Sequence, residues 1–127
     1  MIYGIGTDII EIPRIARSLE RFGDRFARRI LCEPELRRFA AHRQPIAYLA
    51  KRFAAKEAFT KALGTGIHAP ANWHGVWVSN LRSGKPVLEF SAALAALLDA
   101  LGVRRAHLSL SDEKLLACAT VILETDS

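Results

Sequence analysis

Cysteine, proline and glycine are all scarce in this sequence, and each scarcity argues against a class of protein. Two cysteines, five prolines and eight glycines among 127 residues do not suit a disulfide-rich or collagen-like chain. Cys32 and Cys118 are far apart and belong to no Cys-x-x-Cys or Cys/His cluster, which excludes a zinc ribbon. We therefore expect two reduced thiols in a cytoplasmic protein.

Long hydrophobic runs are also missing. No stretch reaches the roughly 18 uncharged apolar residues that a membrane-spanning helix needs, and the first residues lack the basic region and apolar run of a signal peptide. Half of the residues are hydrophobic and 24% are charged. This length and composition predict one globular domain, residues 1–127, that buries roughly two-thirds of its unfolded surface.

The net charge of +5 is concentrated in one segment, residues 14–43, which has nine basic residues and four acidic ones. All nine are arginines: Arg14, Arg17, Arg21, Arg25, Arg28, Arg29, Arg37, Arg38 and Arg43. Arginine suits bidentate capture of carboxylates and phosphates. The segment is therefore either a solvated basic face or a docking surface for nucleic acid, an anionic membrane or an acidic protein.

Hydrophobic periodicity and helix-breaking residues predict ten elements and an α+β fold with a largely antiparallel sheet. Five are expected to be strands, at residues 2–12, 73–79, 86–90, 104–111 and 115–123. Five are expected to be helices, at residues 13–22, 24–31, 33–41, 45–63 and 91–101. Gly23 separates the first two helices, and Gly64 follows the longest one.

The expected helix 45–63 is apolar on nearly every side, which predicts a buried central helix. It nevertheless carries several charged residues, with Arg52 and Lys56 in one sector and Glu57 and Lys61 in another. Glu57 and Lys61 are one turn apart. They form either a plain ion pair between neighbouring turns or a ligand-binding pair, because unpaired charges on a buried helix are costly.

Asp8 lies in an isoleucine-rich strand, where an acid is rare without a partner. Asp8 is either a turn residue or, together with Glu57, a pair of oxygen ligands for Mg²⁺, which one or two carboxylates and substrate phosphates typically hold. Lys61 and the Gly64-Thr65-Gly66 loop could then receive phosphate. A plain helix C-cap is the alternative for that loop.

The four histidines show no metal-ligand spacing. His107 is out of phase with Ala106 and Leu108 in the expected strand 104–111, so it faces the opposite side of the sheet. His107 is either an ordinary exposed histidine or, with Ser109 on the same face, part of an anion site.

Four segments of the sequence resemble the holo-acyl-carrier-protein synthases, a family of bacterial 4′-phosphopantetheinyl transferases. Residues 5–12 (IGTDIIEI) and 51–67 (KRFAAKEAFTKALGTGI) match the two signatures of that family. Residues 84–86 (GKP) and 117–122 (ACATVI) are also similar to it. The resemblance covers essentially the whole chain and implies the 4′-phosphopantetheinyl transferase fold.

The resemblance also implies a reaction. The phosphopantetheine arm of coenzyme A moves to a serine of apo-acyl carrier protein and releases adenosine 3′,5′-bisphosphate, a step of fatty acid biosynthesis. Asp8 and Glu57 match the acids that bind Mg²⁺. Glu57 and Lys61 are the candidate catalytic residues, with Glu57 the candidate base and Lys61 a phosphate contact that assists proton transfer.

The remaining site residues and the partners follow from the same resemblance. The residues expected to contact coenzyme A are Arg52, Lys61, Gly64, Thr65, Gly66, His107 and Ser109. Arg14 matches the arginine that begins a basic docking helix for the acidic carrier protein, and Arg21, Arg25 and Arg28 extend it. Family members are homotrimers with active sites between protomers. This resemblance favours a carrier protein over nucleic acid or a membrane as the partner of the arginine segment.

Overall fold

The computed structural model describes residues 1–126 and confirms the α+β class, with five strands and five helices in this described part. The strands are β1 (Ile2–Glu11), β2 (Val76–Asn80), β3 (Pro86–Phe90), β4 (Val103–Asp112) and β5 (Leu116–Thr125). The helices are α1 (Ile12–Phe22), α2 (Asp24–Ile30), α3 (Glu33–Ala41), α4 (Pro45–Leu63) and α5 (Ala92–Ala100).

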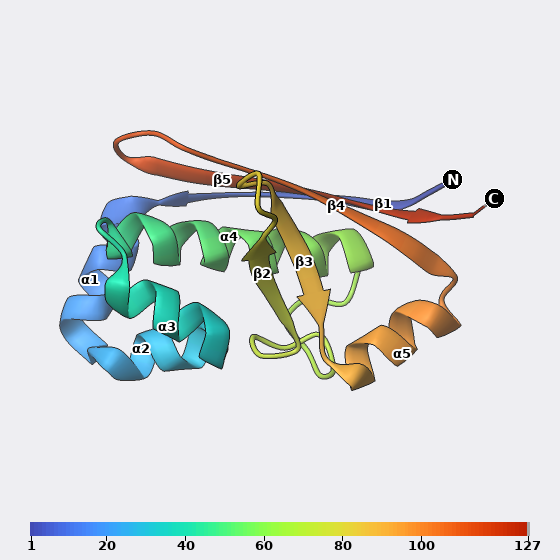
Figure 1. Ribbon diagram of the computed structural model, residues 1–127, viewed down its shortest axis with the longest axis horizontal. Helices are drawn as coiled ribbons and strands as arrows, with labels where there is room; N and C mark the ends of the chain where they lie inside the picture. The colour runs from blue at the N-terminus through green and yellow to red at the C-terminus, as the bar shows by residue number, and fades with distance from the viewer. Residues whose placement is uncertain (127) are drawn as a thin grey trace.

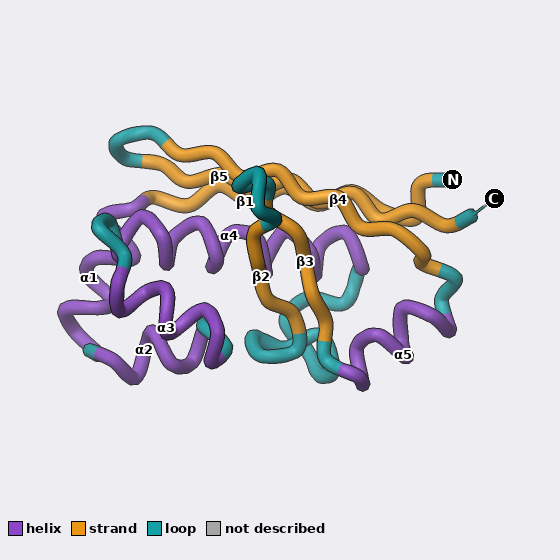
Figure 2. Tube along the Cα trace, viewed as in Figure 1, coloured by secondary structure: helices purple, strands orange, loops and turns teal. Residues whose placement is uncertain are grey.

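All strand pairs are antiparallel, as expected, but they form two separate sheets. One sheet has the order β1-β5-β4, and the other is the β2-β3 hairpin. Helix α4 runs along the three-stranded sheet, and helices α1, α2 and α3 gather at one end of the molecule while α5 lies at the other (Figure 1). Met1 lies beside the end of β5, where its amino group donates to the Thr125 carbonyl oxygen at 3.0 Å (Figure 2).

Helix α4 is the centre of the fold. It begins with Pro45 in its first turn and ends at Gly64, whose φ of 89° is the left-handed conformation that a helix-ending glycine adopts. Most of its residues are buried on every side, as its sequence predicts. Leu49, Ala54, Ala58 and Phe59 are completely buried in the core.

Strand β1 packs its backbone directly on α4. A Cβ on Gly4 would lie 1.9 Å from the Ala62 carbonyl oxygen, and a Cβ on Gly6 would lie 1.9 Å from the Ala58 carbonyl oxygen. Only glycine fits at such a close approach of two backbones. The alanines Ala54, Ala58 and Ala62 recur every four residues on the helix and are buried. Small residues on both elements therefore set the distance between strand and helix.

The expected strand at residues 73–79 begins later in the structure than predicted, whereas the break at Gly23 occurs as predicted. Residues 73–75 are a turn rather than the start of a strand, and β2 begins at Val76. The Trp73 ring packs against Phe53 with 5.0 Å between ring centroids, so this residue contributes apolar contact without sheet pairing. Gly23, with φ of 64°, separates α1 from α2 as expected, which interrupts the arginine stripe that one continuous helix would form.

Within residues 1–126 no helix combines the length and the apolar character needed to cross a membrane.

Candidate active site

Asp8 lies on the face of β1 that packs against α4. Gly4, Gly6, Asp8 and Ile10 alternate onto this face, as the two-residue period of a strand requires. The Asp8 side chain is 16% exposed, and its Oδ1 accepts a hydrogen bond from Lys61 Nζ at 3.0 Å. Asp8 is therefore a paired strand carboxylate facing the helix and not a turn residue.

Glu57 and Lys61 meet Asp8 from one side of α4. Lys61 Nζ also donates to the Thr7 carbonyl oxygen at 3.0 Å, and its side chain remains 52% exposed. The negative charge of Asp8 reaches Glu57: burial, then Asp8, raises the pKa of the Glu57 carboxyl, while Lys61 partly opposes the shift. The structure thus brings Asp8, Glu57 and Lys61 together, and the ion pair of Lys61 within residues 1–126 is with Asp8.

The carboxylate pair fits a hard divalent cation. The negative charge of Asp8 raises the pKa of Glu57 because the two carboxylates repel each other. A cation between them would remove that repulsion. Mg²⁺ usually takes one or two protein carboxylates and completes its shell with substrate phosphates and water. No group of three or more metal-binding side chains occurs in the described residues, so substrate oxygens would have to supply the remaining ligands.

The raised pKa of Glu57 predicts a stability effect. Because the folded protein holds the Glu57 proton more tightly than the unfolded chain does, stability falls as pH rises through the pKa of Glu57. Glu57→Gln should therefore unfold at a higher temperature than the parent protein at pH 7.5 in EDTA, with a gain below about 1 kcal/mol because the group is partly exposed. The difference should vanish near pH 4, where both side chains are neutral; a variant that unfolds at a lower temperature at pH 7.5 would contradict the assignment.

The Gly64-Thr65-Gly66 loop forms a helix C-cap. The amides of Gly64 and Thr65 both donate to the Thr60 carbonyl oxygen, at 2.8 Å and 3.2 Å. The Thr65 hydroxyl donates to the Gly66 carbonyl oxygen at 2.9 Å. All three residues are exposed close to Lys61, so the cap leaves them accessible to a ligand.

His107 and Ser109 lie on the exposed face of β4, opposite the buried Leu108, as the alternation predicts. They border a hollow of about 280 Å³ together with Lys85, Pro86 and Thr120. His107 Nε2 lies 2.5 Å from Glu124 Oε1. This hydrogen bond, above all other causes, lowers the pKa of Glu124. Glu124 could not be recognised from the sequence, because its partner His107 lies 17 residues away and is brought near only by the pairing of β4 with β5.

Arg52 lies apart from Asp8, Glu57 and Lys61. It precedes Glu57 by five residues, which is about 140° around the helix axis. Arg52 is 5% exposed, and its guanidinium lies 4.0 Å from the centroid of the Tyr48 ring and donates to Asn80 Oδ1 at 3.2 Å. Its burial lowers the pKa of Arg52.

Arg52 belongs to a basic hollow rather than to the carboxylate cluster of its own chain. Arg38 donates to the same Asn80 oxygen at 3.2 Å, and the hollow of about 380 Å³ also contains His42, Arg82 and Gly84. Arg52 Nε is buried and has no hydrogen-bond partner among residues 1–126. A buried donor without an acceptor next to further cations is suited to an anionic ligand.

The predicted docking arginines are all exposed and are divided between two helices. Arg14 and Arg21 lie on α1, and Arg25 and Arg28 lie on α2, beyond Gly23. Arg21 stacks over the exposed Phe22 ring at 5.2 Å. The basic surface is therefore bent at Gly23 and includes an exposed aromatic ring.

The most deeply buried charges were not predicted as a pair. Lys56 and Glu35 form an ion pair of 2.7 Å with no exposed side-chain surface on either residue. The available signal was the lysine itself, because a charged residue on an otherwise apolar helix requires a partner. The identity of that partner, on a different helix, was not visible in the sequence.

Known proteins share this fold and these motifs. The sequence model of the 4′-phosphopantetheinyl transferase superfamily matches residues 4–119, which include both carboxylates, the central helix, all of β2, β3 and β4, and parts of β1 and β5. The fold and the strand–helix carboxylate cluster thus define the chain as a member of this superfamily.

Individual relatives give a narrower assignment. The holo-[acyl-carrier-protein] synthase of Nitrosospira multiformis is 52% identical over 124 residues, which are 98% of this chain and 99% of that one. The crystal structure of holo-[acyl-carrier-protein] synthase from Neisseria meningitidis superimposes with a TM-score of 0.96 at 46% identity, covering 98% of this chain and 100% of that one. The chain belongs to the holo-[acyl-carrier-protein] synthase family.

A third similar structure contains a ligand. The holo-(acyl-carrier-protein) synthase of Bacillus anthracis, described as a complex with CoA (3′,5′-ADP), has a TM-score of 0.84 at 39% identity and covers 99% of each chain.

Proposed function

We propose that the chain transfers the 4′-phosphopantetheine group of coenzyme A to a serine of apo-acyl carrier protein, giving holo-acyl carrier protein and adenosine 3′,5′-bisphosphate. The observation that carries the proposal is the cluster of Asp8, Glu57 and Lys61, which lies within a chain of this family. The reaction is one of fatty acid biosynthesis, and we place it in the cytoplasm.

Asp8 and Glu57 would hold Mg²⁺. When bound, the cation supplies positive charge to the phosphate oxygens and stabilises the leaving group. Lys61 now neutralises Asp8; with a cation at the carboxylates, its ammonium becomes available to contact substrate phosphate. Phosphoryl transfer depends mainly on such positioning and charge neutralisation.

The attacking serine hydroxyl must lose a proton. Glu57 is the candidate base because of its position beside Asp8 and Lys61, and it would accept the proton on a carboxylate oxygen that does not hold the cation. Lys61 assists by stabilising the transferred phosphate charge, and Gly64, Thr65 and Gly66 line the same exposed region. His107 and Ser109, at the hollow on β4, are the proposed contacts to the nucleotide part of coenzyme A.

The transfer itself is tested by mass spectrometry. Purified protein is incubated with apo-acyl carrier protein, coenzyme A and Mg²⁺, and the carrier mass is followed with time. A phosphopantetheine adduct on the carrier serine is the expected result, and a serine-to-alanine carrier should remain unmodified. A carrier protein that stays unmodified in every condition would overturn the proposed function.

The carrier protein is proposed to dock on the arginines of α1 and α2, namely Arg14, Arg21, Arg25 and Arg28. Acyl carrier proteins are acidic, so complementary charge favours this encounter. Arg14→Glu should raise KM for the carrier on the order of tenfold at low salt, an effect that salt weakens, and should leave coenzyme A binding unchanged.

Lys114→Glu is the matched control, because it makes the same charge change at an exposed position outside the arginine segment. It should leave KM for the carrier protein nearly unchanged. Equal changes in KM for both substrates of Arg14→Glu would show that Arg14 does not belong to a docking surface.

The outer face of the three-stranded sheet supports a homotrimer. Tyr3, Ile5 and Ile9 alternate onto this face of β1, and Ile5 and Ile9 are 58% and 63% exposed. A row of exposed large apolar residues on a sheet indicates a protein interface. In such an assembly, the basic hollow around Arg52 of one protomer and the carboxylate cluster of its neighbour could bind opposite ends of one coenzyme A molecule.

Ile9→Glu tests the trimer. A charge in this apolar row should shift the protein from trimer to monomer in sedimentation velocity and should lower activity, because the shared site is lost. Leu101→Glu, another exposed apolar position, serves as control and should leave assembly unchanged. A parent protein that sediments as a monomer would refute the proposed assembly.

A further inference from the structure

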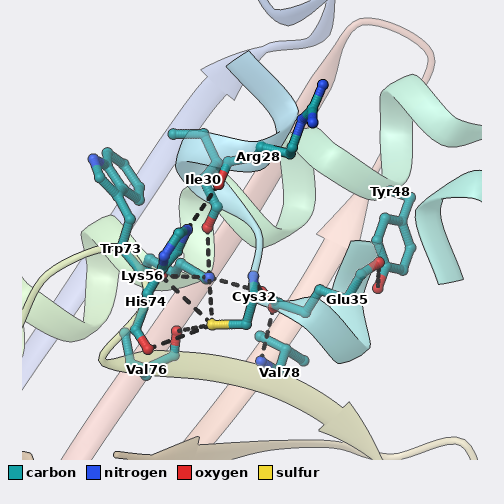
Figure 3. A network of polar contacts seen from close by, with 10 residues as sticks. All are labelled: Arg28, Ile30, Cys32, Glu35, Tyr48, Lys56, Trp73, His74, Val76 and Val78. Atoms are coloured by element: carbon teal, nitrogen blue, oxygen red, sulfur yellow. Dashed lines mark hydrogen bonds and ion pairs between the residues drawn. The ribbon is translucent and has the colours of Figure 1, made fainter. Parts of the chain in front are cut away.

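Lys56 immediately precedes Glu57, but it points away from the carboxylate cluster into the interior. Its Nζ donates to the Ile30 carbonyl oxygen at 2.6 Å, to Glu35 Oε1 at 2.7 Å and to the Trp73 carbonyl oxygen at 2.7 Å (Figure 3). An ammonium group has three N–H donors, and these three acceptors use all of them. This match makes complete burial of the charge tolerable.

Glu35 extends the network to further segments. Its Oε1 also accepts the Cys32 amide at 2.9 Å, and its Oε2 accepts the Val78 amide at 2.9 Å (Figure 3). Both carboxylate oxygens are therefore occupied in the interior. The Glu35 side chain joins the start of α3 to α4 on one side and to β2 on the other.

The Lys56–Glu35 pair thus connects elements that are far apart in the sequence. Ile30 is the last residue of α2. Its carbonyl has no partner within the helix and accepts from Lys56, whose positive charge is favoured at a helix C-terminus. Helix α2 carries Arg25 and Arg28, and it continues α1 across Gly23. Lys56 thus ties the end of α2 and the start of α3 to α4 by hydrogen bonds, in addition to the apolar packing of Ile15 and Ala27 in the core.

Stability alone does not require an ion pair here. Apolar residues of similar volume often stabilise a core as well as a buried salt bridge does. Apolar residues cannot, however, fix the direction of three acceptors from three separate segments. Adjacent residues on a helix point about 100° apart, so one turn of α4 carries both Glu57, facing Asp8, and Lys56, facing the arginine helices.

We propose that Lys56 and Glu35 are positioning residues that hold α1, α2 and α3 at a fixed distance from Glu57, so that a carrier protein docked on the arginines presents its serine to the active site. This inference rests on the proposed docking at Arg14, Arg21, Arg25 and Arg28. Neither residue touches substrate, and both act through the placement of the docking surface.

Two variants of α3 with the same charge change test the proposal. Glu35→Gln keeps an acceptor for Lys56 but turns one oxygen into a donor that faces the Val78 amide. Glu33→Gln, two residues earlier, removes an exposed carboxylate in a weak 3.9 Å pair with Arg37. At a temperature where both are folded by circular dichroism, Glu35→Gln should raise KM for apo-acyl carrier protein about tenfold, and Glu33→Gln should change it less than about twofold.

Coenzyme A binding separates positioning from general damage. The dissociation constant for coenzyme A with Mg²⁺, measured by calorimetry, should be the same in Glu35→Gln and in the parent protein within about twofold. Equal losses in both substrates would overturn the proposal, as would a lowered unfolding temperature with unchanged KM and kcat, because the network would then serve stability alone.

A second pair of variants tests the positioning role even if Glu35→Gln unfolds the protein. Lys56→Met leaves the Glu35 carboxylate buried without its partner and should be strongly destabilised, whereas Lys56→Met combined with Glu35→Leu should recover much of that stability. The double variant should keep the raised KM for the carrier, because it lacks the hydrogen bond from residue 56 on α4 to the Ile30 carbonyl at the end of α2. Recovery of both stability and KM would overturn the proposal.

The two proposals fail in different ways. If Arg14→Glu leaves KM for the carrier unchanged, the docking surface is wrong. If Arg14→Glu raises KM and Glu35→Gln does not, the docking surface stands and the positioning role is wrong.

Discussion

Asp8→Ala should abolish phosphopantetheine transfer while the protein stays folded. Asp8 is one of two carboxylates proposed to hold Mg²⁺, so its removal should lower kcat/KM by about a thousandfold, the scale lost when a key charge-stabilising group is removed. Folding should change little, because the only partner of Asp8 among side chains of residues 1–126 is the half-exposed Lys61, and such partly solvated pairs contribute about 1 kcal/mol or less. Mass spectrometry of the carrier protein and thermal unfolding measure the two effects.

The variant also separates the roles of Asp8 and Lys61. Asp8→Ala removes the hydrogen bond from Lys61 to Asp8 but leaves Lys61 itself in place. A phosphate contact made by Lys61 should therefore survive the change. A large loss of activity would therefore be assigned to the missing carboxylate.

Glu11→Ala is the matched control, since it removes an exposed acid from the same strand. It should leave transfer near the parent rate. Asp8→Asn should be partly rescued by excess Mg²⁺ because it keeps an oxygen ligand. Transfer that persists undiminished in Asp8→Ala, or parent activity that is unaffected by EDTA, would contradict the metal assignment.

The sequence predicted the elements well where their signals are local. Helix 45–63 matched α4 residue for residue, because Pro45 and Gly64 mark its ends and its apolar pattern is strong. The expected helix 91–101 also begins correctly, since Ser91 is the N-cap of α5 and its Oγ accepts the Leu94 amide at 3.2 Å. The division of the strands into two sheets was not predicted, because strand pairing depends on contacts that no local pattern encodes.

The same distinction holds for the site. The sequence pointed to Asp8, Glu57 and Lys61 because each is a charged residue in a strand or helix whose other residues are mostly apolar. Glu35 and Glu124 could not be found in this way, since each is identified only by a partner far along the chain. Arg52 was proposed from family resemblance, and its isolation from Glu57 within one chain is a finding of the structure.

Gly6→Ala should be the most destabilising single-methyl change in β1. The added Cβ would lie 1.9 Å from the Ala58 carbonyl oxygen and 2.7 Å from the Ala62 amide nitrogen. Both are backbone atoms of a buried helix and cannot rotate away, so strand and helix must separate. We expect a loss of about 3 kcal/mol or more in the free energy of unfolding, which lowers the unfolding temperature by about 10 °C or more.

Gly64→Ala is the control for Gly6→Ala in unfolding experiments. Gly64 has a φ of 89° and a ψ of 12°, which is the left-handed region, and nothing lies within 4 Å of the added Cβ, so this change costs only the left-handed strain of about 1–2 kcal/mol. A loss of stability in Gly6→Ala no larger than in Gly64→Ala would show that the close approach of β1 and α4 is not rigid.

A second substitution on the helix identifies the contact behind the Gly6→Ala effect. Ala58→Gly removes a methyl group from α4 but leaves the carbonyl oxygen in place. The double variant Gly6→Ala/Ala58→Gly should therefore lose as much free energy of unfolding as the two single variants lose together. Rescue by Ala58→Gly would mean that side chains, not backbones, set the spacing.

Because Asp8 follows Gly6 on the same face of β1, widening this spacing moves Asp8 away from Glu57 and Lys61. The folded fraction of Gly6→Ala should therefore need more Mg²⁺ for half-maximal activity than the parent protein, an effect that loss of stability alone does not produce.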